Sequence, residues 1–368
     1  MVKRTRLGDI NGIDDNKIQT FLGIRYGEPP INERRFKASV ASGGWKNTFE
    51  ATSFPNRAMQ LKLLDADGRK IPGKVSEDCL FMNIYTPKNI SKLAPVLVWM
   101  HGGAFKNGSA NEFDGSVLAE QQQVVVVTLN FRLGAFGFVD FSRFGAEYAG
   151  SASNGVRDAI LALQWIQDNI EEYSGDPSNV TISGESSGGT MVLSLLGCPS
   201  ADSLYQKAIA CSPTCAYRDL EDPTNKIRLA LNINTDDYLS PMLKMSSLDI
   251  CNIELGFGPH VDGEVIKEST FQAIKSRGVN GVPLIIGSNS REGTLYTEGK
   301  DQDQPHYKLW NSGLAREMLC GGNPDPYLAA LKAKYPDASP GKFHELIWTD
   351  MFRRTVTETA RITAEAGI

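Results

Sequence analysis

Long hydrophobic runs are missing from this 368-residue chain. The longest, Pro95–Met100 and Val124–Val127, have the length of a β-strand, whereas a membrane-spanning helix needs about 20 apolar residues. The N-terminal segment Met1–Asp9 contains basic residues, but it is not followed by the apolar stretch that a secretory signal requires. The sequence therefore predicts neither a membrane-spanning nor a secreted protein.

Blocks of basic residues are missing as well. The formal net charge of −5 comes from 38 Lys and Arg against 43 Asp and Glu, spread along the chain without a positive cluster. Nucleic acids and anionic membrane surfaces are bound by local concentrations of Lys and Arg. We therefore expect no nucleic-acid partner and no membrane partner.

The cysteines form no recognisable framework. No pair has the C-x-x-C spacing, and no histidine stands near them in a metal-ligand pattern, so we expect no zinc or other metal site. A disulfide framework is not expected in a chain of this size, so reduced thiols in a cytoplasmic protein are the simpler interpretation. The six positions are Cys79, Cys198, Cys211, Cys215, Cys251 and Cys320.

What is present is an alternation of apolar strands and amphipathic helices. The run Pro95–Met100 is continuously apolar, which is typical of a strand covered on both faces. Arg157–Ile170 repeats apolar residues at three- and four-residue steps and predicts a long helix. This order predicts a single α/β domain over residues 1–368, with a mostly parallel sheet and helices on both faces. Further expected strands are Lys17–Tyr26, Leu80–Tyr85, Val124–Leu129, Val180–Ile182, Lys207–Cys211 and Val282–Gly287, and further helices are Met191–Leu196, Pro326–Lys334, Phe343–Trp348 and Phe352–Ala366.

One stretch organises the chemistry. Gly184-Glu185-Ser186-Ser187-Gly188 lies between a predicted strand and a predicted helix. A Gly-x-Ser-x-Gly turn in this context is a nucleophile elbow, in which glycines on both sides allow a tight turn that raises the serine hydroxyl above the sheet. We therefore predict that Ser186 is a nucleophile.

A second glycine-rich turn follows the strand Pro95–Met100. Gly102 and Gly103 lack a Cβ atom, so their backbone N–H groups can approach a substrate oxygen, and the N–H of Ser187 follows the nucleophile directly. Together they could form an oxyanion hole. Each turn alone could be a tight connection, but both in this chain order favour the catalytic interpretation.

These motifs together resemble the type-B carboxylesterases, the cholinesterase-like branch of the α/β-hydrolases. The resemblance implies an α/β-hydrolase fold and hydrolysis of a small-molecule carboxylic ester through an acyl-enzyme, without cofactor or metal. It also implies that Glu292, in Gly287–Gly293, is the acid of the triad. The matching motifs are Ser76–Leu80, His101–Phe105, Asn130–Gly134, Asn154-Gly155 with Asp158, Gly175–Pro177 and Gly184–Ser186.

The base of the triad has no match. In the family it is a histidine in a His-Gly-x-Glu context near the C-terminus, beyond a helix that Thr349–Phe352 resembles, and that motif is absent here. His101 and His260 precede the acid, and His306 follows it by only about fourteen residues. We interpret His306 and His344 as surface or structural residues, and the chain as C-terminally short relative to the family.

A short chain has two further consequences. It could be a catalytically weak or inactive homologue that acts, if at all, by binding, or a fragment without stable function. An unpaired sheet edge and an uncovered apolar face are then expected. Where secreted members pair a cysteine with the one matching Cys79, this sequence has Ala58-Met59-Gln60, so Cys79 is expected to be a free thiol.

Overall fold

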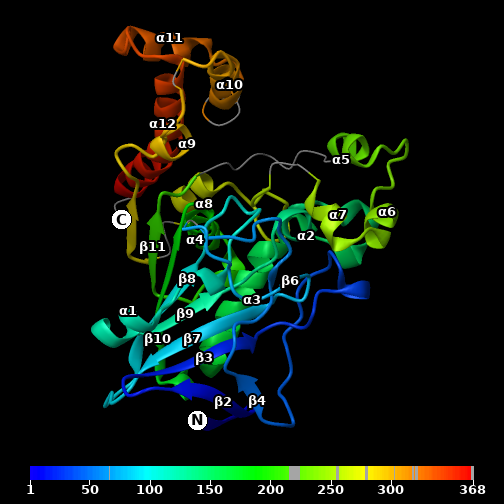
Figure 1. Cartoon of the computed structure of the whole chain (residues 1–368), viewed down its shortest axis with the longest axis vertical. Helices are drawn as coiled ribbons and strands as arrows, with labels where there is room; N and C mark the ends of the chain where they lie inside the picture. Colours follow the sequence, from blue (N-terminus) through cyan, green and yellow to red (C-terminus); the bar gives the residue numbers. More distant parts are fainter. Residues whose placement is uncertain are drawn as a thin grey trace.

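The computed structural model describes residues 1–65, 67–214, 224–253, 257–277, 281–301, 303–316, 319 and 322–365. Ten strands within these ranges form one sheet in the order β1-β2-β3-β7-β9-β8-β10-β11-β12, with β4 paired to β2 (Figure 1). Their bounds are β1 Val2–Thr5, β2 Gly8–Asp14, β3 Ile18–Arg25, β4 Phe49–Ala51, β7 Phe81–Pro87, β8 Ala94–Met100, β9 Val125–Leu129, β10 Gly175–Glu185, β11 Lys207–Cys211 and β12 Leu284–Gly287. A separate pair is formed by β5 Arg57–Ala58 and β6 Val75–Ser76.

The central sheet is parallel where the site residues are. Strands β9, β8, β10, β11 and β12 run parallel to one another, whereas β7, β3 and β2 are antiparallel neighbours. Met100 pairs with Gly184, and Cys211 pairs with both Glu185 and Gly287. The carboxyl ends of β8, β10, β11 and β12 therefore meet at one edge of the sheet. This arrangement confirms the prediction of a mostly parallel sheet. Ligands bind at this edge in sheets of this kind.

Helices cover both faces of the sheet. Ile84 and Val127 belong to the main core with α3 and α4, whereas their chain neighbours Tyr85 and Val126 pack with Ala119 of α1 on the opposite face. The helices are α1 Ser116–Gln122, α2 Gly134–Phe138, α3 Asn154–Asn169, α4 Ser187–Leu196, α5 Thr224–Leu231, α6 Leu239–Lys244, α7 Ser247–Cys251, α8 Thr270–Arg277, α9 Thr294–Thr297, α10 His306–Ala315, α11 Asp325–Lys334 and α12 Pro340–Glu365. No helix within the described ranges is long and apolar enough to cross a bilayer.

Burial along β8 differs from the expectation of a strand covered on both faces. Val96, Val98 and Met100 are buried, but Leu97 and Trp99 on the opposite face are only half-buried. On that same face, Ile285 of β12 is 68% exposed. The helix α1 covers this face over β3, β7 and β9, whereas apolar side chains of β8 and β12 stay accessible.

One local prediction was wrong. The segments Phe343–Trp348 and Phe352–Ala366 form one continuous helix, α12, as far as Glu365. Gly175–Pro177 opens β10, with a register shift between Gly175 and Val180. The described parts of 216–260 contain three helices, α5 to α7.

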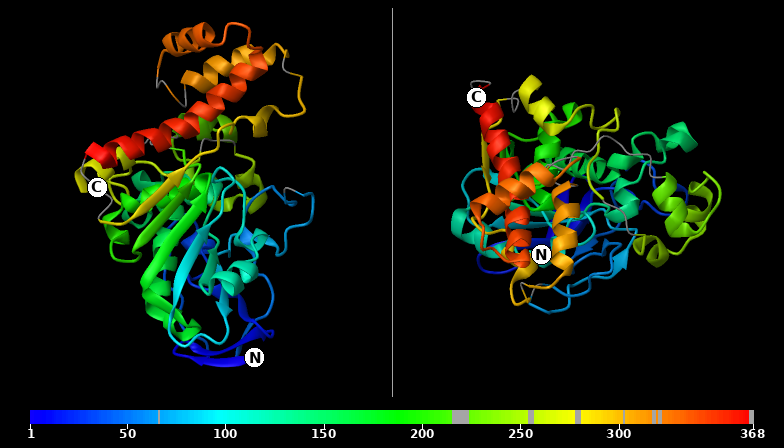
Figure 2. Two further views of the ribbon diagram at one scale, coloured as in Figure 1. Left: turned by 90° about the vertical axis from the view of Figure 1, so that its left-hand side faces the viewer. Right: turned by 90° about the horizontal axis from the view of Figure 1, so that it is seen from above.

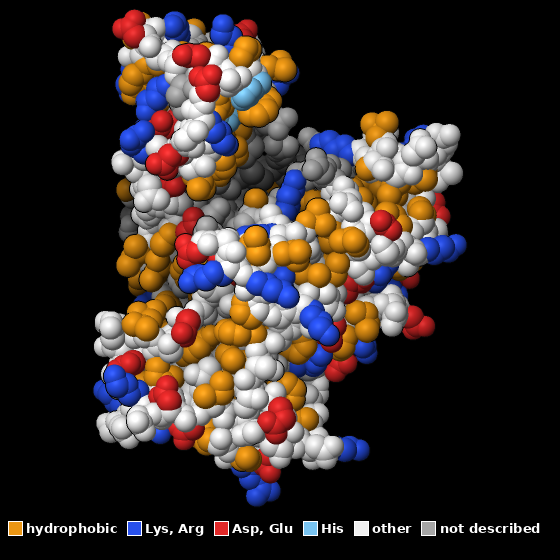
Figure 3. All heavy atoms as spheres, viewed as in Figure 1, with side chains coloured by type: hydrophobic (Ala, Val, Ile, Leu, Met, Phe, Trp, Pro, Cys, Tyr) orange, Lys and Arg blue, Asp and Glu red, His pale blue; other side chains and the backbone are white. Residues whose placement is uncertain are grey.

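The last three helices form a projection above the carboxyl edge of the sheet. Figure 1 and the left view of Figure 2 show α10 and α11 at the far end, with α12 running back from them to the sheet. A small core of its own, Ala315, Leu331 and Ile347, holds α10, α11 and α12 together. In the space-filling view the surface between this projection and the part of the molecule around α2 and α7 is hollowed (Figure 3).

Candidate active site

The predicted nucleophile lies in a strained turn between β10 and α4. Ser186 has φ 55° and ψ −121°, a backbone conformation that costs free energy in a residue with a side chain. A Cβ atom on Gly184 would lie 2.4 Å from the carbonyl carbon of Gly188, and one on Gly188 would lie 2.0 Å from the carbonyl oxygen of Met100. The glycines of the motif are therefore required by the close approach of the backbone.

Two backbone hydrogen bonds fix this turn. The N–H of Ser186 donates to the carbonyl of Cys211 at 2.9 Å, and the N–H of Thr190 donates to the carbonyl of Ser186 at 2.9 Å. The first bond continues the ladder between β10 and β11, and the second belongs to the first turn of α4. Ser186 is therefore held between the sheet and the helix while its side chain stays half-buried.

The loop after β8 approaches the nucleophile directly. A Cβ atom on Gly102 would lie 3.2 Å from the Cβ of Ser186 and 2.8 Å from Oε2 of Glu185. The next three residues all have positive φ: Gly103 at 113°, Ala104 at 55° and Phe105 at 56°. Consecutive residues in such conformations turn their N–H groups toward an anion. The predicted Gly102 thus lies beside Ser186, and the predicted Gly103 and Ala104, which sequence reasoning missed, belong to the same turn.

A buried ion pair braces this loop. Arg132 and Asp158 are almost completely buried, and their side chains approach to 2.7 Å. Arg132 belongs to the loop Asn130–Gly134, and the N–H of Gly134 donates to the carbonyl of Phe105 at 2.8 Å. The segments around Arg132 and Asp158 therefore help to position the loop Gly102–Phe105.

Ser187 is the first residue of α4 and is buried. Its hydroxyl has no hydrogen-bond partner among the residues that the structure describes. His101, which precedes the glycines, stacks on Phe131 with ring centroids 4.6 Å apart. Burial lowers the pKa of His101 to about 4, so its imidazole is neutral at pH 7. His101 therefore supports the loop and is not a charged group of the site.

The predicted acid lies in the loop that follows β12. Ser212, directly after β11, donates its hydroxyl to Oε1 of Glu292 at 2.5 Å, and the N–H of Asn289 donates to the same oxygen at 2.6 Å. Burial, and second the charge of Glu292, raise the pKa of Glu185. The acid is therefore near enough to the elbow to influence the residue before Ser186. Ser212 was missed in the sequence, although its position at a strand end was a usable signal.

The helix α12 holds the acid loop from the other side. The N–H of Gly293 donates to Oγ1 of Thr349 at 3.0 Å, and Arg291 forms an ion pair with Glu345 at 3.0 Å. A Cβ atom on Gly293 would lie 1.9 Å from the carbonyl oxygen of Glu345. The Thr349-Asp350 motif thus serves to position the loop of Glu292.

Neither histidine that follows the acid lies at the nucleophile. Nδ1 of His344 is 2.8 Å from Oδ1 of Asn311, and its Nε2 accepts from Nε1 of Trp348 at 3.1 Å, so both ring nitrogens are occupied. Burial lowers the pKa of His344. His306 is exposed and packs on Tyr307 and Trp310. Their interpretation as structural and surface residues is confirmed.

The Ser186 hydroxyl has no hydrogen-bond partner within the described ranges, which contain all four histidines of the sequence. The geometry thus brings together a strained serine, a loop of N–H donors and an oriented carboxylate, but no imidazole. Within the same ranges no three His, Cys, Asp or Glu side chains are grouped as metal ligands.

Cys79 is a free, buried thiol, as predicted; Cys215 and Cys320 lie outside the described residues.

Comparison with known proteins extends these observations. The Carboxylesterase family model matches residues 1–319. Para-nitrobenzyl esterase of Bacillus subtilis is 36% identical over 313 residues, which are 79% of this chain and 63% of that protein. Human Carboxylesterase 5A is 36% identical over 318 residues, which are 79% of this chain and 54% of that protein. The chain therefore spans about half to two thirds of the length of these curated relatives.

Solved structures confirm the predicted α/β-hydrolase fold. A thermophilic PNB esterase superposes with a TM-score of 0.86 at 32% identity, covering 99% of this chain and 77% of its own. Carboxylesterase EST55 of Geobacillus stearothermophilus superposes with a TM-score of 0.86 at 30% identity, covering 100% of this chain and 78% of its own. The predicted site residues therefore lie on a fold shared with esterases.

Proposed function

From the premise that this chain belongs to the carboxylesterase family, we propose that the protein hydrolyses small-molecule carboxylic esters through an acyl-enzyme on Ser186. The observation that carries the proposal is the strained conformation of Ser186 at the junction of β10 and α4, with the Gly102 loop beside it. A strained nucleophile is retained only where the surrounding structure enforces it, and such sites cluster where chemistry occurs. The proposed site belongs to one domain that includes the whole chain.

The oxyanion of the tetrahedral intermediate would be bound by backbone N–H groups. We assign Gly102, Gly103 and Ser187 to this role and add Ala104, because its positive φ continues the turn that begins at Gly103. Such donors act strongly because they are already oriented before charge develops on the substrate oxygen. Ser187 contributes through its position at the start of α4, where the helix dipole also favours negative charge.

Glu292 would orient and stabilise an imidazolium during proton transfer. Its hydrogen bonds from Ser212 and Asn289 hold one carboxylate oxygen in place. No imidazole contacts Ser186 within the described ranges, so the imidazole would have to be supplied in another way. This supports a second candidate function, in which the chain alone binds esters and hydrolyses them weakly or not at all.

The free thiol of Cys79 is in keeping with a reducing compartment, and we propose the cytoplasm.

The test is hydrolysis of p-nitrophenyl butyrate by residues 1–368, by the Ser186→Ala variant and by Glu292→Gln. Loss of the base in a serine hydrolase costs on the order of a million-fold in turnover, about as much as loss of the serine, so without added base the expected rate is slow and close to that of Ser186→Ala. Free imidazole in the buffer should raise the rate of the wild type more than that of Ser186→Ala. Equal rates in both proteins, with and without imidazole, would show that Ser186 is not a nucleophile in this chain.

A further inference from the structure

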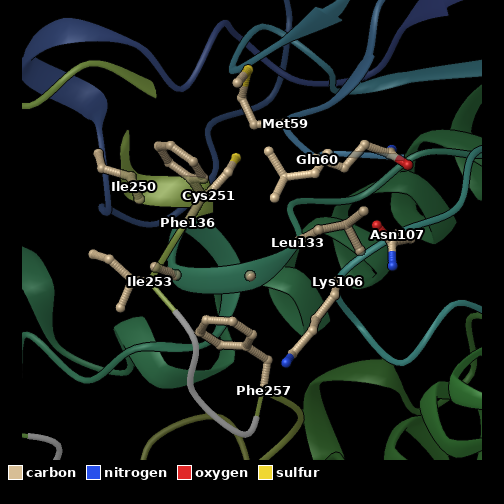
Figure 4. Close-up of a pocket in the computed structure, with 13 residues that line it drawn as sticks. Met59, Gln60, Lys106, Asn107, Leu133, Phe136, Ile250, Cys251, Ile253 and Phe257 are labelled. Atoms are coloured by element: carbon tan, nitrogen blue, oxygen red, sulfur yellow. The ribbon is translucent and has the colours of Figure 1, made fainter. Parts of the chain in front are cut away.

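A cavity of about 230 Å³ lies beside Lys106 and Asn107, directly after the loop Gly102–Phe105 (Figure 4). The other segments that line it are distant in the sequence: Met59–Leu61, Leu133–Phe136 at the start of α2, and the end of α7 with Ile253 and Phe257. Since a water molecule occupies about 30 Å³ in the liquid, the volume suits an apolar chain of roughly six to eight groups. The cavity is thus sized for a substituent of a ligand.

The oxyanion loop and the cavity share one turn. The carbonyl of Gly103 accepts hydrogen bonds from the N–H groups of Lys106 at 3.0 Å and Asn107 at 2.9 Å. Both of these residues line the cavity. The turn that contains Gly103 therefore forms part of one wall of the cavity.

Two polar side chains of the lining are not available to a charged ligand group. Gln60 is buried, and its amide is already used: Nε2 donates to the carbonyl of Gly108 at 2.8 Å and Oε1 accepts from the N–H of Gly108 at 3.0 Å. Burial, and second the charge of Glu77, raise the pKa of Cys251 to about 11, so its thiol is neutral at pH 7. Among the described side chains of the lining, Lys106 and Asn107 keep polar capacity.

Lys106 supplies a positive charge at one end. Its ammonium lies 5.7 Å from the ring centroid of Phe257, and Figure 4 shows both side chains at the opposite end of the cavity from Met59. The nearby carboxylates are occupied, since Glu77 pairs with Arg35 and Glu112 with Lys62. Lys106 itself forms no ion pair with any residue of the described ranges.

From this arrangement we infer that the cavity selects esters that carry a carboxylate at the far end of an apolar chain, with Lys106 as the specificity-determining residue. The apolar chain would lie against Leu133 and Phe136, and the carboxylate would meet the exposed ammonium of Lys106 at the rim. The inference rests on the proposed function for the claim that the ligand is an ester. The binding preference itself does not require hydrolysis.

The first test is binding of octanoate against octan-1-ol, two ligands of the same chain length, measured by titration calorimetry. The expected result is about fivefold tighter binding of octanoate at low salt, an advantage that shrinks in 0.5 M salt because the ion pair is exposed. Lys106→Met should remove the preference and Lys106→Arg should keep it. The matched control is Lys92→Met, which should leave the preference unchanged. Lys92 is an exposed lysine just before the start of β8, whereas Lys106 follows the end of that strand.

The Ser186→Ala variant separates this inference from the proposed function. If it retains the octanoate preference while hydrolysis is lost, both stand; if no variant hydrolyses esters but the preference is present, only the proposed function fails. Where the wild type is active, mono-p-nitrophenyl adipate should be hydrolysed with about fivefold higher kcat/KM than p-nitrophenyl hexanoate, and Lys106→Met should equalise them. Equal binding of octanoate and octan-1-ol to the wild type, or a preference that survives Lys106→Met, overturns the inference.

Discussion

The two sides of the proposed site are built in different ways. On the nucleophile side, Ser186 and the Gly102 loop are positioned by backbone atoms in contact with other backbone atoms. On the acid side, Gly293 makes one such backbone contact, but the loop of Glu292 is also held by side chains of two other elements, Ser212 after β11 and Thr349 of α12. Backbone contacts tolerate no added atom, whereas side-chain hydrogen bonds can be lost one at a time. The nucleophile side should therefore respond to substitution abruptly and the acid side, apart from Gly293, gradually.

The largest effect is expected for Gly188→Ala. The new Cβ would lie 2.0 Å from the carbonyl oxygen of Met100, so either the elbow or β8 must move. Unfolding free energy should fall by about 4 kcal/mol or more, the range reserved for severe steric conflicts. Urea denaturation measures this, and Gly43→Ala, where a Cβ would meet nothing within 4 Å, is the control. Similar stability of the two variants would contradict the steric account.

A smaller loss is expected for Asp158→Ala, which leaves Arg132 buried without its partner. Removing one member of a buried ion pair costs about 3 to 5 kcal/mol, because an uncompensated charge remains in the interior. Thermal denaturation followed by circular dichroism checks this. On the acid side, Arg291→Ala should leave the melting temperature close to that of the wild type, since the Arg291 side chain is 65% exposed. A large loss from Arg291→Ala would mean that the two sides are not different.

Ser212→Ala tests the acid side directly. It removes the 2.5 Å hydrogen bond to Glu292, and a hydrogen bond to a charged group contributes about 1.5 to 3 kcal/mol to stability. If Glu292 is the acid, the rate in the presence of added imidazole should also fall about tenfold, because the carboxylate that orients the imidazole keeps its charge but loses an anchor. Ser178→Ala, which removes an exposed hydrogen bond to Asp176, should change neither quantity. An unchanged imidazole-stimulated rate in Ser212→Ala would remove Glu292 from the mechanism.

The smallest effect is expected at Glu185, which lies between the two sides. Burial and the charge of Glu292 raise its pKa above the ordinary value of 4.5, so the folded state binds this proton more tightly than the unfolded chain. Stability from this group is therefore complete below pH 4.5 and is lost as pH rises through the raised pKa. Glu185→Gln should be more stable than the wild type at pH 7 by a few tenths of a kcal/mol, because solvent screens the charge, and equal to it at pH 4. An advantage that persists at pH 4 would point to another cause.

The difference between the two sides also explains what could be predicted from the sequence. The sequence predicts the role of Gly184, Gly188 and Gly102, because a tight backbone approach at each position excludes every other residue. The residue type alone therefore indicates the constraint. Ser212 and Thr349 could not be assigned this way, because their role depends on a fold that brings β11 and α12 to the loop of Glu292. The single helix α12 was divided because the polar pair Thr349-Asp350 interrupts its apolar pattern, although Thr349 is buried there against Gly293.

The hydrogen bond from Ser186 to the carbonyl of Cys211 has a consequence for measurement. Because this amide is the final rung of the ladder between β10 and β11, its proton can exchange with solvent only when that end of the sheet opens. Hydrogen–deuterium exchange at the single amide of Ser186 therefore counts how often the nucleophile leaves its place. The exchange rate of this amide therefore reports on the integrity of the site in the absence of substrate.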